Sequence, residues 1–219
     1  NANINVIDNV NRSEAQIIDS YNNESGIVTL NSITDTVVNV TAVENNANIS
    51  LDTSTITVTD AATLVNANTI KEFTNAQVTL NSVEDTVSNI TSIDLIDSND
   101  VSMAAAAITV TDAASLADAT AINGFTDGLV TLQKVEDTVS NITSIDGIDS
   151  NDVSMASAAI TVTDAASLAD ATAINGFTKG LVTLNSVEDT YAKIQDIKSI
   201  ADTEVDMGAA AVKVSDNVT

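Results

Sequence analysis

The 219-residue sequence contains no cysteine, no histidine, no proline and no tryptophan, and its aromatic residues are limited to two tyrosines and three phenylalanines. Without cysteine or histidine, the chain can form no disulfide, no zinc site of ordinary ligands, no thiolate nucleophile and no imidazole base. These absences exclude most familiar catalytic arrangements. We therefore expect a protein that is not an enzyme and holds no cofactor.

Basic residues are also scarce, since 7 Lys and Arg stand against 31 Asp and Glu and leave a formal net charge of −24. Binding to nucleic acid needs a cationic surface, and an anionic membrane surface repels an acidic chain. No apolar run approaches the roughly 20 residues of a membrane-spanning helix. We expect neither a nucleic-acid partner nor membrane insertion. The hydrophobic fraction of 44% is nevertheless too high for a disordered acidic chain, so the protein should fold.

The most informative feature that is present is an internal repeat. The motif Ile-Thr-Val-Thr-Asp occurs at 56–60, 108–112 and 160–164, with degenerate copies at 4–8 and 212–216, and a second motif, Val-Glu-Asp-Thr, occurs at 83–86, 135–138 and 187–190. Together with residues 33–36, the two motifs place one aspartate in each 25–27-residue unit: Asp8, Asp35, Asp60, Asp85, Asp112, Asp137, Asp164, Asp189 and Asp216. The term aspartate column refers to this series below.

The repeat predicts about eight coils arranged in 52-residue pairs, near residues 4–55, 56–107, 108–159 and 160–211, with a partial unit at 212–219. A unit of this size cannot bury its own apolar face and must stack on its neighbours. No linker or change of composition interrupts the series. We therefore expect residues 1–219 to form a single elongated repeat domain, an excerpt of a longer repeat protein.

Within a coil, the hydrophobic period changes in a fixed order. Residues 130–132, 153–155 and 160–162 alternate with period two and are rich in β-branched side chains, which predicts short strands. Residues 113–121 are alanine-rich and predict a short helical segment. Aspartate is a preferred N-cap, so each column aspartate is expected to cap the helical segment that follows it. The expected fold is a β-solenoid resembling a parallel β-helix, with a strand–helix (α/β) solenoid as the alternative.

Calcium binding is the functional alternative to helix capping as an explanation of the many carboxylates. The candidate ligands lie in two related loops, residues 94–100 and 146–152, and are Asp97, Asp100, Asp149 and Asp152. Their spacing matches neither an EF-hand nor the glycine-rich nonapeptide of calcium-binding β-helices, which favours solvated turn residues. A catalytic carboxylate pair is disfavoured because an active site is singular, whereas every conspicuous carboxylate here belongs to a repeated series.

The segments 85–90, Asp-Thr-Val-Ser-Asn-Ile, 137–142, with the same sequence, and 189–194, Asp-Thr-Tyr-Ala-Lys-Ile, carry a resemblance to a known family. They resemble the Asp-Thr-Ala-Ala-Asn-Leu type of repeat found in very large secreted or surface proteins of bacteria, marine cyanobacteria and alphaproteobacteria included, and in some of their phages. The resemblance covers nearly the whole chain. The sequence departs from the pattern of this family in every second coil; residues 112–116, for example, read Asp-Ala-Ala-Ser-Leu. The resemblance implies a solenoid stalk or filament segment outside the cell.

The sequence thus predicts a structural repeat segment of an extracellular surface protein, such as an adhesin stalk, sheath, matrix or filament. A virion fibre or spike is one alternative, and a calcium- or carbohydrate-binding module is another. The expected partner is the chain itself, through end-to-end association or through stacking on neighbouring repeats of the parent chain.

Overall fold

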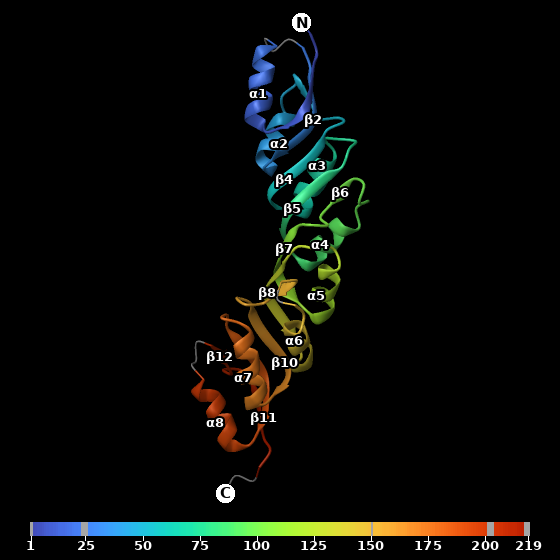
Figure 1. Ribbon diagram of the computed structural model, residues 1–219. Helices are drawn as coiled ribbons and strands as arrows, with labels where there is room; N and C mark the ends of the chain where they lie inside the picture. The colour runs from blue at the N-terminus through green and yellow to red at the C-terminus, as the bar shows by residue number, and fades with distance from the viewer. Residues whose placement is uncertain (1, 23–25, 150, 201–203, 217–219) are drawn as a thin grey trace. The chain divides into compact units, whose positions relative to one another are not determined.

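The computed structural model describes residues 2–22, 26–149, 151–200 and 204–216, in which short strands and helices alternate along the chain (Figure 1). The chain divides into two compact units, residues 1–108 and 109–219, which are described one at a time. Strand β7 (Ala107–Ala114) contains the residue boundary between them.

The first unit is a parallel sheet covered by helices. Its main strands follow the order β1-β2-β4-β5, with the two-residue strands β3 and β6 paired to β2 and β5. Its elements are β1 (Ile4–Val10), α1 (Arg12–Tyr21), β2 (Val28–Asp35), α2 (Val37–Glu44), β3 (Ile49–Ser50), β4 (Thr55–Ala62), α3 (Leu64–Lys71), β5 (Val78–Asp85), α4 (Val87–Asp94) and β6 (Val101–Ser102).

The second unit repeats this arrangement. Strand β10 pairs with β8 on one side and β11 on the other, β9 pairs with β8, and β12 and β13 both pair with β11, all in parallel. Its elements are α5 (Leu116–Asn123), β8 (Val130–Asp137), α6 (Val139–Asp146), β9 (Val153–Ser154), β10 (Ala159–Ala166), α7 (Leu168–Phe177), β11 (Val182–Asp189), α8 (Tyr191–Ser199), β12 (Val205–Asp206) and β13 (Ala211–Val214).

In each unit the helices lie against one face of the sheet. Each main strand pairs with the main strand that follows it along the chain, and crossovers of one hand then carry the intervening helices to the same side. The period-two burial agrees, because Val28 and Leu30 of β2 are fully buried while Thr29 between them is half-exposed. The result is a two-layer strand–helix architecture whose other sheet face meets solvent.

The core consists of aliphatic columns that run from strand to strand. Ile56 of β4 lies between Ile33 of β2 and Val78 of β5, and all three side chains are fully buried. The helices complete the core with a narrow apolar stripe, which in α3 is Ala67 and Ile70. Stacking like side chains in register lets each coil bury its apolar residues against two neighbours.

The expected β-helix-like cross-section is wrong, and the strand–helix alternative fits the structure better. The sheet is not closed, and each repeat turns through an α-helix of 8 to 10 residues. The physical reason is the spacing of the buried residues after each strand, such as Ile90 and Ile93, which fall three apart and form one helical stripe. The continuous domain expected over residues 1–219 stays a prediction.

The strands and helix predicted from individual segments are confirmed in place. Residues 130–132 and 160–162 lie in β8 and β10, and residues 153–154 of the predicted strand 153–155 form β9. Of the predicted helical segment 113–121, residues 116–121 lie in α5, whereas Ala113 and Ala114 still belong to β7. Among the residues that the structure describes, no helix is long and apolar enough to span a membrane.

Ile70 provides a test of the core. Its side chain is fully buried, so Ile70→Ala should lower the free energy of unfolding by about 3 kcal/mol through lost transfer energy and the cavity left behind. Leu95→Ala is the matched control, because Leu95 is 79% exposed and its loss should change stability by less than about 0.5 kcal/mol. Urea denaturation of the two variants measures both values, and equal losses would contradict this account of the core.

Candidate functional site

Within each unit, the aspartate column links neighbouring coils. Seven of its carboxylates accept a hydrogen bond of 2.8 to 3.1 Å from the first backbone amide of the helix in the preceding coil. The pairs are Asp35 with Arg12, Asp60 with Val37, Asp85 with Leu64, Asp137 with Leu116, Asp164 with Val139, Asp189 with Leu168, and Asp216 with Tyr191. Each of these carboxylates therefore lies at the positive end of a neighbouring helix dipole.

The prediction that each column aspartate caps its own helix is wrong. The N-cap residues are asparagine, threonine or serine, and seven of them accept a hydrogen bond from the third helical residue: Asn11, Thr36, Thr63, Thr86, Ser115, Thr138 and Ser167. Asp85 lies one residue before the N-cap Thr86, and Asp60 lies three residues before Thr63. At these positions the aspartates still belong to the strands, from which their carboxylates reach the adjacent coil.

The coils of the Val-Glu-Asp-Thr type saturate their aspartate with donors. Asp85 accepts from Leu64 N at 2.9 Å, from Thr86 N at 2.8 Å and from Asn89 Nδ2 at 2.8 Å. The same donors recur around Asp35 and Asp137. The Asp-Thr-x-x-Asn spacing is therefore a structural motif that ties a strand end, its own helix and the preceding helix together.

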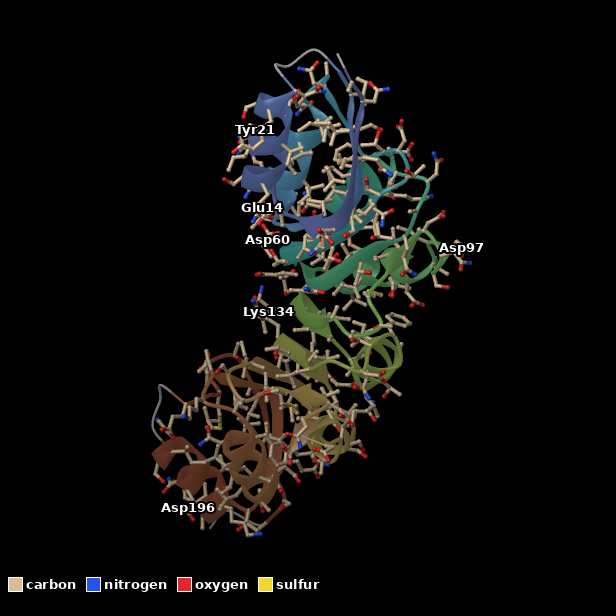
Figure 2. All side chains as sticks on the ribbon, turned by 45° about the horizontal axis from the view of Figure 1, so that its top comes forward. Glu14, Tyr21, Asp60, Asp97, Lys134 and Asp196 are labelled. Carbon is tan, nitrogen blue, oxygen red and sulfur yellow. The ribbon has the colours of Figure 1, made fainter. Side chains whose placement is uncertain are left out.

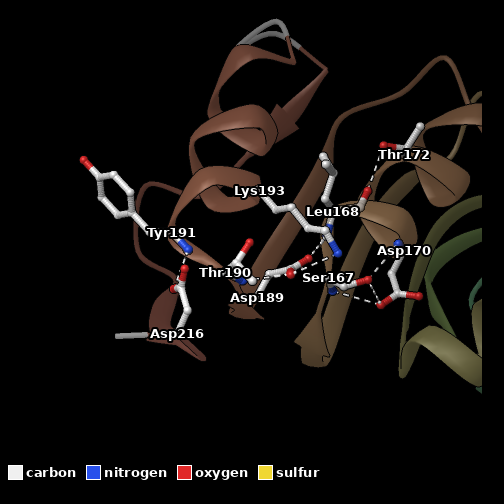
Figure 3. A network of polar contacts seen from close by, with 9 residues as sticks. All are labelled: Ser167, Leu168, Asp170, Thr172, Asp189, Thr190, Tyr191, Lys193 and Asp216. Atoms are coloured by element: carbon white, nitrogen blue, oxygen red, sulfur yellow. Dashed lines mark hydrogen bonds and ion pairs between the residues drawn. The ribbon is translucent and has the colours of Figure 1, made fainter. Parts of the chain in front are cut away.

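The asparagine of this motif is a functional residue that the sequence reasoning missed. The signal available was its constant position four residues after the aspartate, in the pairs Asp35 and Asn39, Asp85 and Asn89, and Asp137 and Asn141. In the last such coil Lys193 stands at the position of the asparagine, and its Nζ lies 3.4 Å from Asp189 Oδ1 (Figure 3).

The coils of the Ile-Thr-Val-Thr-Asp type place their aspartate on a β-bulge. Val58 pairs with Leu80 and Ala61 pairs with Ser82, so that Thr59 and Asp60 together oppose the single residue Asn81. The same shift occurs in β1 and β10. A bulge turns the strand locally, and here it accompanies the hydrogen bond from Val37 N to Asp60 Oδ1 at 2.8 Å.

The electrostatics of the column favour the ionised form. Burial raises the pKa of Asp137, but the hydrogen bonds from Leu116 N, Asn141 Nδ2 and Thr138 N outweigh burial and hold this pKa below its usual value. Asp85 has a lowered pKa for the corresponding reasons. At Asp189 the hydrogen bond from Thr190 N is the main cause of a lowered pKa. These carboxylates are therefore charged at neutral pH and act as acceptors, not as proton donors.

The four calcium candidates lie in turns, and the side chains of Asp97, Asp100 and Asp149 have partners within the chain. Asp97 Oδ1 accepts from Asn99 N at 2.9 Å and Asn99 Nδ2 at 2.8 Å, and Asp149 makes the same two bonds with Asn151. Asp100 pairs with Lys71 Nζ at 3.3 Å, and Asp152 N donates to the Asp149 carbonyl at 2.8 Å. Figure 2 shows Asp97 on the outside of its loop and far from Asp60.

No cluster of acidic groups suited to a metal accompanies these turns. Over residues 2–22, 26–149, 151–200 and 204–216, no three acidic side chains are grouped so that they could hold an ion. Calcium binding stays a prediction at these positions, and the hydrogen bonds of Asp97 and Asp149 account for both side chains as Asx turns.

A surface hollow of about 460 Å³ lies in the first unit at the start of α1, where Arg12 is the only arginine of the chain. Its polar groups belong to the contacts between coils. Arg12 N donates to Asp35 Oδ2 at 2.9 Å, and Arg12 Nη1 donates to Asn39 Oδ1 at 3.1 Å. The hollow thus contains the first set of bonds of the aspartate column.

Comparisons with known proteins found no match: no family model, no curated protein and no solved structure is similar to this chain. The resemblance of residues 85–90 and 137–142 to the Asp-Thr-Ala-Ala-Asn-Leu repeats stays a prediction. The structure supplies a physical role for the residues that carry it, because Asp85, Thr86 and Asn89 hold one another through hydrogen bonds.

Asp137→Asn tests the column through its pH dependence. The variant should lose about 2 kcal/mol of unfolding free energy at pH 7, because an amide cannot accept from all three donors. The lowered pKa means that the stabilisation is complete above the unfolded-state value of about 3.9 and is lost as the pH falls through the folded-state value. Wild type and variant should therefore converge in acid, as chemical denaturation at several pH values will measure.

The matched control for this test is Asp127→Asn, which removes the same charge from an exposed turn of the same unit. Lys179 occupies the corresponding position in the following 52-residue period, so the turn does not need a carboxylate. We expect a change of less than about 0.5 kcal/mol at every pH. A gap between wild type and Asp137→Asn that persists unchanged at pH 3 would contradict the assigned role of the carboxylate.

Proposed function

We propose that this chain is a structural, non-catalytic repeat segment of an extracellular surface protein, such as an adhesin stalk, sheath, matrix or filament. The observation that carries the proposal is the use of the recurring carboxylates. Asp35, Asp85 and Asp137 each accept from the first amide of the preceding helix, from the amide of the N-cap threonine and from an asparagine side chain, and so serve the stacking of coils. An active site would instead aim unpaired groups at a substrate.

The packing supports the same role. Aliphatic side chains such as Ile56, Ile108 and Ile160 recur at 52-residue intervals and are fully buried, so every pair of coils adds the same core layer. Such a scaffold can be lengthened by adding further repeats with the same interfaces, which suits a spacer. The high negative charge keeps parallel copies apart at low ionic strength. The extracellular location is supported by the resemblance of the Asp-Thr-x-x-Asn segments.

Deleting one period tests whether the chain is a modular scaffold. Removal of residues 108–159 joins Ala107 to Ile160 and restores the Ala-Ile sequence found at the junctions 107–108 and 159–160. We expect this variant to fold, with unchanged helicity per residue by circular dichroism and a modestly lower melting temperature, because one set of coil interfaces is lost.

The control deletion removes residues 108–134, so that Val135 takes the place of Ile108 and the alternation of coil types is broken without a one-residue shift of the strand. This variant should lose cooperative melting, because two coils of the same type would then be neighbours and their hydrogen-bond patterns would not match. A 52-residue deletion that unfolds as completely as this control would contradict the scaffold function.

Two alternatives compete with the structural function. One is a calcium- or carbohydrate-binding module, and the other is a virion fibre. The acidic loops recur 52 residues apart, at Asp97 and Asp149, as repeated binding loops would. Because ligand at about 100 times its dissociation constant stabilises a protein by about 2.7 kcal/mol, calcium titration followed by melting temperature separates the two functions. We expect no shift at millimolar calcium; a rise that the double variant Asp97→Asn, Asp149→Asn abolishes would favour the binding module. Detection of the chain in purified phage particles would favour the fibre.

A further inference from the structure

The second unit carries a reactive dipeptide at the ends of two helices. Asparagine is followed by glycine at two places in the chain, Asn123-Gly124 and Asn175-Gly176, which lie 52 residues apart at the C-terminal ends of α5 and α7. An asparagine side chain loses ammonia when the backbone nitrogen of the next residue attacks its amide carbon. Glycine permits this attack best, because it has no Cβ to hinder the approach.

Asn175 also joins two neighbouring coils. Its Nδ2 donates to Glu204 Oε2 at 3.3 Å and so links the last turn of α7 to the turn before β12. The first unit has the same contact at the end of α3, where Lys71 Nζ lies 3.3 Å from Asp100 Oδ2. In both cases a donor on the helix meets a carboxylate 29 residues later in the chain. We call this the helix-to-turn contact.

The helix-to-turn contact needs a donor on the helix, and deamidation removes it. The product at position 175 is a carboxylate, which cannot donate to Glu204 and repels it. The new charge also lies in the last turn of α7, at the negative end of the helix dipole, where an anion is unfavourable. In the isoaspartate form the backbone is longer by one methylene, so the last helical turn cannot keep its hydrogen bonds. Either product therefore weakens the link between the two coils.

Water has access to this contact. A surface hollow of about 180 Å³ is lined by Asn175, Thr178, Lys179, Gly180 and Glu204. Gly176 is exposed, and Asn175 is half-buried. Among the residues that the structure describes, Lys179 forms no ion pair with Glu204, so the contact with Asn175 is not replaced by a neighbouring cation.

The state of the helix end controls the attack. Gly176 lies within α7, and in an α-helix each amide donates to the carbonyl four residues earlier, so the attack requires the last turn to open. Helix ends open locally at a low cost in free energy. The identical sequence in α5 ends its helix two residues earlier, at Asn123, which shows that this last turn is marginal.

We propose that Asn175 is a site of spontaneous deamidation that weakens the stacking of coils as the protein ages. Gly176 N forms a bond to Asn175 Cγ, the Cγ–Nδ2 bond breaks, and the proton of Gly176 N leaves with the amino group as ammonia. Water then opens the cyclic imide at one of its two carbonyls and gives aspartate or isoaspartate. The chemistry goes beyond the proposed function, whereas its consequence, a scaffold of limited lifetime, rests on that function.

Gly176→Ala tests the chemistry. A Cβ at this position would meet no atom within 4 Å, and alanine is the better helix former, so the variant should fold like the wild type. Both full-length proteins are aged in the folded state at mildly alkaline pH. Peptide mass spectrometry should find aspartate and isoaspartate at position 175 of the wild type, at several-fold lower yield in the variant. Asn141 is the internal control and should stay intact, because isoleucine follows it and its Nδ2 donates to Asp137 at 2.8 Å.

Two substitutions of Asn175 test the consequence. Asn175→Asp reproduces the charge of the product and should lower the melting temperature by about 2–4 °C, because repulsion replaces a hydrogen bond. Salt should reduce this difference. Asn175→Lys is the matched control and should not lower the melting temperature, because it places a lysine opposite Glu204 as in the contact of the first unit. Ageing should destabilise the wild type more than Gly176→Ala, in which Asn123 is the remaining asparagine before a glycine.

An aged wild type with intact Asn175, under conditions that convert the chain unfolded in urea, would overturn the proposal. Equal yields from the wild type and Gly176→Ala would overturn the role of Gly176 N. Equal melting temperatures of the wild type and Asn175→Asp would overturn the weakening of the contact. Circular dichroism verifies that the proteins compared are folded. Because the 52-residue deletion tests the scaffold by itself, a failure of this inference can be distinguished from a failure of the proposed function.

Discussion

The rest of the structure depends on one type of hydrogen bond, which in seven helices runs from the first amide of the helix to the aspartate of the coil that follows. A helix of 8 to 10 residues is too short to be stable alone and leaves its first amides without intrahelical acceptors. The next coil provides a carboxylate for one of these amides, and the N-cap threonine, serine or asparagine provides for another. Local helix formation and the stacking of coils are thereby coupled, since each helix is completed by its neighbour.

The same bond explains how an acidic chain can place carboxylates in an ordered series. Asp35, Asp85 and Asp137 each have three hydrogen-bond donors, so that hydrogen bonding outweighs burial and the charge is retained. The aliphatic columns of Ile33, Ile56 and Val78 provide the non-directional part of the stability. The carboxylates add direction, because each bond requires neighbouring coils to be in the correct register.

Two repeat motifs correspond to two solutions of one geometric problem. In the Val-Glu-Asp-Thr coils the aspartate ends the strand, whereas in the Ile-Thr-Val-Thr-Asp coils it sits on a bulge, as Asp60 does opposite Asn81. Both place an oxygen on the helix of the preceding coil. This equivalence accounts for a column that keeps its role although its spacing is 25 residues in some intervals and 27 in others.

The sequence by itself determined the 52-residue period, the strand segments, the buried aliphatic columns and the lack of cysteine and histidine chemistry, because periodicity and composition are local properties of the chain. Only the tertiary structure decided that the sheet stays open, that the aspartates bind the preceding helix and that Asn39, Asn89 and Asn141 complete the motif. The reason is that an aspartate placed just before a helix fits the local N-cap pattern whether or not it caps that helix. Whether its oxygen accepts from its own helix or from an amide more than 20 residues away depends on how the coils stack, which no single coil encodes.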